Sequence, residues 1–232
     1  MTKTLLVASV HALGTSAGLD DLMNDRSYAR FKEQVLPHIT NKSLVLCEGI
    51  LSDSPITPTH PKYDFIKKRM LGDALTVQPT LWGFDHRQSG SQEKDQAKIA
   101  RHDLWTRVVQ QTLEYPTWKY MQVRTFAQVL ELARTSSSDD VRLIETPSSE
   151  QVEVARWIRA INRKFDRLYL EGMRKHSPRY DSCVFIGGGA HVVSMALKSE
   201  HEAIDLSEAG TESTQMLMAY LVDYVWPNAF IK

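Results

Sequence analysis

Two histidines follow short apolar runs near opposite ends of the chain. The run LLVASVH ends at His11 and the run VFIGGGAH ends at His191, and in both the imidazole comes after small residues. A third apolar run, SLVLC, is followed directly by Glu48, where a charge needs water, a partner or a functional role. Histidines and carboxylates together act as ligands of divalent metals or as a general acid and base. We therefore predict a site made of His11, Glu48 and His191.

Three glycines precede the second histidine. The pattern predicts a buried strand at residues 183–186, a tight turn at glycines 187–189 and a helix that begins near His191. Such a junction leaves backbone N–H groups free for an anionic group, so Gly188 and Gly189 are candidate substrate-binding residues. The segment is neither a dinucleotide fingerprint, because Val192 replaces the last glycine, nor a phosphate loop, because no Lys-Ser or Lys-Thr pair directly follows the glycines.

Alternation of strand-like and helix-like segments predicts an α/β fold with a central, mainly parallel sheet flanked by helices. We expect one domain over residues 1–232, with an inserted helical segment at about 95–135. The expected strands are residues 4–10, 43–47, 80–84, 141–145, 183–186 and 203–206, and the expected helices are residues 25–36, 65–75, 95–115, 118–134, 149–175 and 211–224.

The predicted sheet explains how distant residues would meet. Residues just past the carboxyl ends of parallel strands converge on one edge of the sheet. The two histidines and Glu48 follow three such strands, and Asp85 and Arg87 follow the strand at 80–84. We therefore add Asp85 to the candidate metal ligands and Arg87 to the candidate substrate-binding residues.

Composition limits the partners that the chain is expected to bind. Lys plus Arg and Asp plus Glu both number 28, which argues against a nucleic acid or an anionic membrane as a partner. No apolar run approaches the roughly 18 residues that a membrane span needs, and the two cysteines lie in apolar runs that suit reduced, inert thiols. We expect a cytoplasmic protein that acts on a small molecule or a peptide.

The segment at 149–175 has the clearest helical pattern, with Ser149 as its expected N-cap. Apolar residues recur every three or four positions on one face, at Val154, Ile158, Ile161, Phe165 and Leu168. Arg159, Arg163 and Arg167 lie four apart on a roughly opposite face. Those arginines form a solvated face, or one of them binds an anionic substrate or a developing oxyanion.

Several short segments, in their order along the chain, resemble the TraB and GumN-like family. They are ASVH near the start, VLCEG, WGFDHR, the arginine-rich late helix and GGAHVVSM. This group is classed with the Tiki metalloproteases and, more distantly, with erythromycin-esterase-like and ChaN-like proteins. The resemblance implies functional roles for His11, Glu48, His191 with Gly188, the segment at 83–85, and Arg163 or Arg167.

The resemblance implies a hydrolase of amide or ester bonds. Its Tiki-type members depend on a divalent metal such as Mn, Co or Zn, whereas the esterase-like branch is described as using a histidine base without metal. Ala8 stands where the family motif has a glycine, and that departure favours a second interpretation. In it, the chain is a catalytically silent module that binds a ligand or a peptide on the same fold.

Overall fold

The computed structural model describes residues 3–9, 25–48, 55–72, 75–84, 92–206 and 211–232. The chain divides into two compact units. The first comprises residues 1–88 and 168–208, and the second comprises residues 89–167 and 209–232. The helical segment predicted at about 95–135 lies within the second unit, and helix α7 (Ser149–His176) contributes residues to both.

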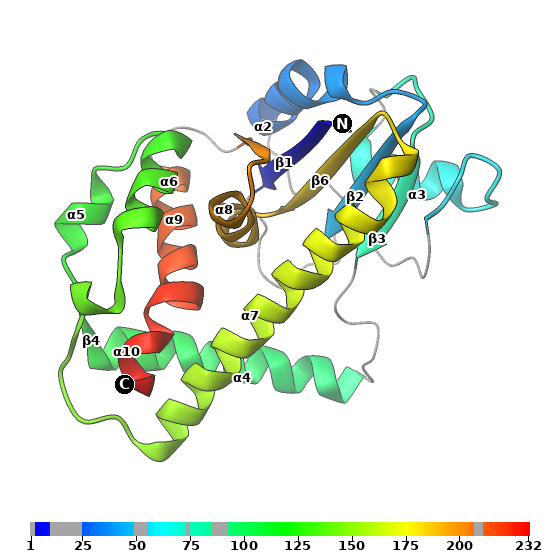
Figure 1. The fold of residues 1–232 in the computed structure, drawn as a ribbon. Helices are drawn as coiled ribbons and strands as arrows, with labels where there is room; N and C mark the ends of the chain where they lie inside the picture. Colours follow the sequence, from blue (N-terminus) through cyan, green and yellow to red (C-terminus); the bar gives the residue numbers. More distant parts are fainter. Residues whose placement is uncertain (1–2, 10–24, 49–54, 73–74, 85–91, 207–210) are drawn as a thin grey trace. The chain divides into compact units, whose positions relative to one another are not determined.

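The first unit contains a five-stranded sheet in the order β3-β2-β6-β1-β7, and every neighbouring pair of strands is parallel (Figure 1). This confirms the predicted α/β fold with a central parallel sheet. Because β6 lies between β1 and β2, the ends of all three strands reach one edge, as the sequence predicted. The strands are β1 (Lys3–Ser9), β2 (Ser43–Glu48), β3 (Thr80–Phe84), β6 (Ser182–Gly188) and β7 (Glu202–Asp205).

One face of the sheet packs against helices from the first half of the chain. Strand residues such as Val45 and Val184 form a single buried cluster with side chains of η1 and α3, including Phe31 and Tyr63. The helices on this side are α2 (Asp25–Arg30), the π-helix η1 (Phe31–Val35), the 3₁₀ turn η2 (Leu36–His38) and α3 (Tyr63–Leu71). The helix predicted at 25–36 therefore changes its winding twice before it ends, the second time beside Pro37, which has no N–H to continue it.

The other face of the sheet is covered by the C-terminal part of α7 and by α8 (Gly189–Lys198). Tyr169 of α7 packs on Phe185 of β6 with ring centroids 4.9 Å apart, and His176 packs on Trp82 of β3 at 4.5 Å. Figure 1 shows this end of α7 crossing β2 and β3. Glu48 is in register with Phe84, and its side chain lies on this same face.

The predicted glycine turn at 187–189 was wrong. Gly187 and Gly188 complete strand β6, and Gly189 is the first residue of α8. Among the described residues only Gly72, which ends α3, has a positive φ, at 69°. The backbone at 187–189 therefore does not require glycine for its dihedral angles.

The second unit is mainly helical. Helix α9 (Thr211–Tyr220) lies beside α5 (Thr117–Met121) and α6 (Phe126–Thr135) (Figure 1). Two short strands, β4 and β5, pair antiparallel. The remaining elements are α4 (Gln92–Thr112), β4 (Leu113–Glu114), η3 (Ser138–Asp140), β5 (Arg142–Leu143), the first part of α7, the π-helix η5 (Leu221–Val225) and α10 (Pro227–Ile231).

Capping residues set the helix boundaries that the sequence pattern missed. The single helix predicted at 118–134 is two helices, because Thr125 is extended and forms a capping box with Gln128 that begins α6. The N-cap of α7 is Ser148 rather than Ser149, since the Ser148 hydroxyl accepts the N–H of Gln151 at 3.2 Å. Local side-chain hydrogen bonds decided both positions.

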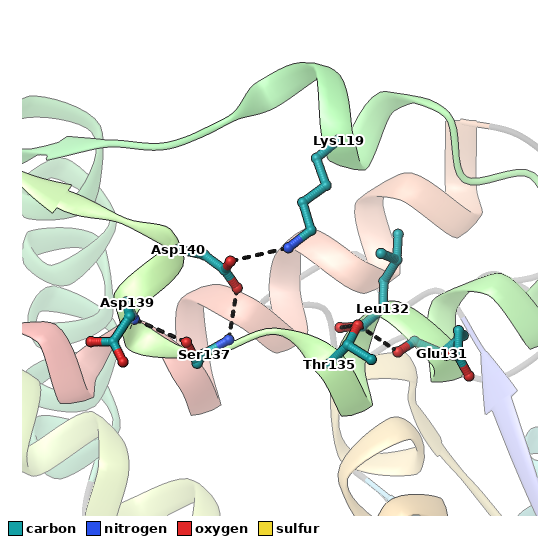
Figure 2. Close-up of polar contacts among 7 residues, drawn as sticks. All are labelled: Lys119, Glu131, Leu132, Thr135, Ser137, Asp139 and Asp140. Atoms are coloured by element: carbon teal, nitrogen blue, oxygen red, sulfur yellow. Dashed lines mark hydrogen bonds and ion pairs between the residues drawn. The ribbon is translucent and has the colours of Figure 1, made fainter.

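A polar network holds the turn η3 in place (Figure 2). Asp140 accepts the backbone N–H of Ser137 at 2.8 Å and an ion pair from Lys119 at 3.1 Å. The Ser137 hydroxyl accepts the N–H of Asp139 at 3.1 Å, and Lys232 pairs with the Asp139 carboxylate. These contacts tie α5 and the C-terminal residue to one turn.

The long helix α7 buries much of its predicted apolar face. Val154, Ile158 and Phe165 are buried, but Leu168 is 41% exposed, and Asp166 is buried instead. In the part of the chain that the structure describes, no helix is both long enough and apolar enough to span a membrane.

Candidate functional site

The structure brings Glu48 and His191 together at the carboxyl edge of the sheet. Glu48 is the last residue of β2, and His191 is the third residue of α8. His191 Nε2 lies 3.7 Å from Glu48 Oε1, and the side chains are only 14% and 12% exposed, respectively. This distance is within the range of an ion pair, which forms when the imidazole is protonated, and it is longer than a hydrogen bond. Two of the three residues predicted to form the site are therefore neighbours.

The other carboxylate oxygen of Glu48 binds the start of α8. Glu48 Oε2 accepts the backbone N–H of Gly188 at 2.7 Å, and Gly188 is the N-cap residue of this helix. A negative charge is favourable there, because the helix dipole is positive at its N-terminus. The sequence predicted an anion at this junction, and the anion that Gly188 meets is a side chain of the protein itself.

Gly187 is required for space. A Cβ atom on this residue would lie 2.5 Å from Cε1 of Phe185 and 3.1 Å from Glu48 Oε2. Real Cβ contacts are longer than the first of these distances, so a larger residue would push the Phe185 ring and the carboxylate aside. The glycine that the sequence placed in a turn instead makes room for the Glu48 side chain over β6.

Sequence reasoning missed Tyr169, which contacts His191. The two rings lie 5.6 Å apart between centroids and are almost perpendicular, at 88°. Tyr169 is 1% exposed. A signal was present in the sequence, because Tyr169 follows Phe165 by four residues and so continues the apolar face of α7.

Cys47, next to Glu48 in sequence, is the inert thiol that the sequence predicted. Burial and, to a smaller extent, the negative charge of Glu48 raise the pKa of Cys47 to about 12. Burial raises the pKa of Cys183 to about 12 as well. Neither thiol is a nucleophile at neutral pH, because the thiolate is the reactive form.

Three predicted site residues, His11, Asp85 and Arg87, lie outside the described residues. The strand that precedes His11 is described, and its last residue, Ser9, is in register with Gly188 of β6. The carboxyl ends of β1 and β6 are thus adjacent. The meeting of His11 with His191 stays a prediction.

The predicted arginines lie on α7, in the second unit. Arg163 and Arg167 are both exposed. Partial burial and repulsion from the Arg159 guanidinium lower the pKa of Arg163. Their predicted role toward a substrate stays a prediction, as do those of Gly188 and Gly189 at the start of α8.

The described residues supply two of the four predicted metal ligands. A carboxylate and an imidazole are groups that Zn, Mn and Co accept, so the donor chemistry of Glu48 and His191 fits part of such a site. Within the described ranges no group of three or more His, Cys, Asp or Glu side chains is placed to hold a metal. The other two predicted ligands, His11 and Asp85, are outside those ranges.

Comparisons with models of protein families, with curated proteins and with solved structures found no match to this chain.

Proposed function

We propose that the chain is a hydrolase that cleaves an amide or ester bond at the carboxyl edge of its parallel sheet. The observation that carries the proposal is the contact between His191 and Glu48, a largely buried imidazole and carboxylate 3.7 Å apart. Parallel sheets commonly bind ligands at this edge. A histidine and a carboxylate that contact each other largely out of water form a common catalytic pair.

In the proposed reaction, His191 is the general base. It takes a proton from the attacking water and returns it to the leaving amine or alcohol when the bond breaks. Glu48 balances the positive charge that the imidazole carries between these two steps. The N–H of Gly188 holds the carboxylate in position through its 2.7 Å hydrogen bond.

The proposal extends to the residues that the structure leaves untested. In the metal-dependent version of the proposal, Glu48 and His191 would instead act with His11 and Asp85 to hold Mn, Co or Zn, and such an ion would supply Lewis-acid activation of water in place of the histidine base. Arg163 or Arg167 would bind negative charge on the substrate, and Arg87, Gly188 and Gly189 would contact it. The chain would then be a cytoplasmic member of the TraB and GumN-like group that acts on a small molecule or a peptide.

A second candidate function is a catalytically silent module that binds a ligand or a peptide. It is supported by the contacts of Glu48, since one carboxylate oxygen accepts the Gly188 N–H and the other faces His191. In this alternative, the carboxylate serves to hold β2 and α8 together.

The two functions are distinguished by hydrolysis assays with p-nitrophenyl esters and fluorogenic peptide amides. We expect His191→Ala to lower kcat/KM by about 100-fold or more, the usual contribution of a general base, and Glu48→Gln to lower it less. His176→Ala is a matched control, because His176 packs on Trp82 at 4.5 Å in the same unit and has no proposed role in the reaction. The control should keep the wild-type activity.

Each result has a clear meaning. Full activity in His191→Ala contradicts the role of His191 as the general base. No hydrolysis by the wild type across both substrate sets contradicts the hydrolase and supports the binding module. Assays with EDTA and with added Mn, Co or Zn separate the two catalytic versions. Loss of activity in EDTA that one metal restores supports the metal-dependent form, and unchanged activity supports the histidine base alone.

A further inference from the structure

We infer that Tyr169 is a positioning residue that fixes the imidazole of His191 toward Glu48. The inference deepens the proposed function and rests on it for the effect on catalysis. Its physical part concerns the orientation and mobility of one ring, and that part is testable without a substrate.

The ring of Tyr169 contacts both Phe185 and His191. Its ring packs on Phe185 with centroids 4.9 Å apart, and Phe185 is fully buried in the sheet. The Tyr169 ring in turn lies 5.6 Å from the His191 ring at 88°. A continuous row of three rings therefore connects β6, α7 and α8.

The contact with Glu48 leaves part of the His191 orientation undetermined. At 3.7 Å, Nε2 and the carboxylate attract each other without forming a hydrogen bond, so the carboxylate alone does not fix the plane of the imidazole. The terminal torsion of histidine is broad. The nearly perpendicular ring of Tyr169 restricts that torsion, because aromatic pairs favour this edge-to-face arrangement.

Orientation matters in the proposed reaction because proton transfer depends on geometry. A general base must reach the proton that it removes within hydrogen-bond distance. A displacement of about 1 Å in a catalytic group can lower a rate by about 100-fold. Because Nε2 is the atom that faces Glu48, rotation of the ring would also change its distance to the carboxylate.

Packing alone gives a competing account of Tyr169, since its ring is buried in the core of the first unit. The two accounts differ in what they predict for His191. If Tyr169 only fills space, its loss lowers stability and leaves the motion of His191 unchanged. Trp82 supplies the matched control, because it makes a similar contact with another histidine of the same unit, His176, at 4.5 Å and 75°.

The test measures ¹³C relaxation of ring-labelled histidines in the full chain. We compare wild type with Tyr169→Phe, which keeps the ring, with Tyr169→Leu and Tyr169→Met, which remove it, and with Trp82→Leu. We expect the His191 ring to keep a high order parameter, near the value of about 0.85 that rigid backbone shows, in wild type, Tyr169→Phe and Trp82→Leu. In the ring-less variants we expect it to fall below about 0.6, in the flexible range. Tyr169→Met, whose unbranched and flexible side chain adapts to irregular gaps, carries the test if Tyr169→Leu does not fold.

Kinetics provide the second readout. We expect the ring-less variants to lower kcat by about 10-fold or more with little change in KM, since a displaced base loses transition-state interactions. Tyr169→Phe should keep the wild-type kcat. An unchanged His191 order parameter in both ring-less variants would overturn the inference, whatever their activity. Loss of His191 order in a protein without hydrolase activity would support the positioning role and reject the proposed function.

Discussion

Two pairs of histidine and carboxylate occur in the described residues, one in each unit, and they differ in their surroundings. His191 and Glu48 lie 3.7 Å apart at the carboxyl edge of the sheet, and His102 and Asp223 lie 3.5 Å apart between helical segments of the second unit. Residue type and separation are nearly the same. The backbone around each pair is what distinguishes them.

The pair in the second unit belongs to a set of contacts that hold helices together. Asp223 is part of the π-helix η5, whose backbone carbonyls accept the Trp105 indole N–H at 3.0 Å and the Asn162 amide at 3.4 Å. The next residue, Tyr224, donates to the buried Asp166 of α7 at 2.7 Å. The pair in the first unit instead sits at a strand end beside glycine backbone, where the fold class places ligands. Composition of a pair alone therefore does not identify a functional site.

If the carboxylates of the second unit serve its stability, the largest loss of stability should follow when the hydrogen bond between Tyr224 and Asp166 is removed. Tyr224→Phe removes a hydrogen bond to a buried carboxylate, which contributes about 1.5–3 kcal/mol. We expect the Tm to fall by about 3–10 °C. Tyr115→Phe is the control, since in the described part of the chain the Tyr115 hydroxyl makes no hydrogen bond and its ring packs on Trp226 at 4.7 Å. Equal Tm values for Tyr224→Phe and Tyr115→Phe would contradict a stabilising role for the carboxylates of the second unit.

A substitution at Gly187 tests whether the geometry of the pair of His191 and Glu48 depends on strand β6. Gly187→Ala forces the new Cβ against the Phe185 ring, 2.5 Å away, and overpacking of a core costs about 1–3 kcal/mol. Thermal denaturation of Gly187→Ala, Phe185→Leu and the double variant measures the coupling. We expect the smaller side chain at 185 to recover about 1 kcal/mol of that loss. Strictly additive losses would show that the clash is relieved in another way.

The smallest change in stability is expected when the pair of His102 and Asp223 is removed, and this change should depend on pH. The ion pair with Asp223 raises the pKa of His102 above its ordinary 6.5, against the opposing effect of burial, and Asp103 adds to the rise. A raised pKa in the folded state means that the pair stabilises the protein below pH 6.5 and that this contribution is lost as the pH rises through the folded-state pKa.

We therefore expect Asp223→Asn to lower the Tm at pH 5.5–6 by a few degrees, since a partly exposed pair contributes about 1 kcal/mol or less. The difference from wild type should shrink as the pH approaches 9. Asp103→Asn, which removes the minor contributor, should keep most of the pH dependence. A difference between wild type and Asp223→Asn that is constant with pH would exclude His102 as its source.

Much of the fold could be predicted because its signals are local. The runs TLLVAS, SLVLC and TLWGF are largely apolar, and each lies in a strand of the sheet. Boundaries were less predictable where a side chain caps a helix, as Thr125 does for α6. The exposure of Leu168 and the burial of Asp166 also departed from the helical pattern, because the neighbours of α7 decide which of its residues are covered.

The sequence by itself determined the five strands of the central sheet, their parallel pairing in an α/β fold, and the candidates Glu48 and His191 at strand ends. It did so because apolar periodicity and strand termini depend on residues close together in the chain. Only the tertiary structure decided that Glu48 meets the N–H of Gly188, 140 positions away in sequence, that Tyr169 touches His191, and that Gly187 supplies space rather than a turn. These are contacts between side chains from different strands and helices, and packing, rather than local pattern, sets them.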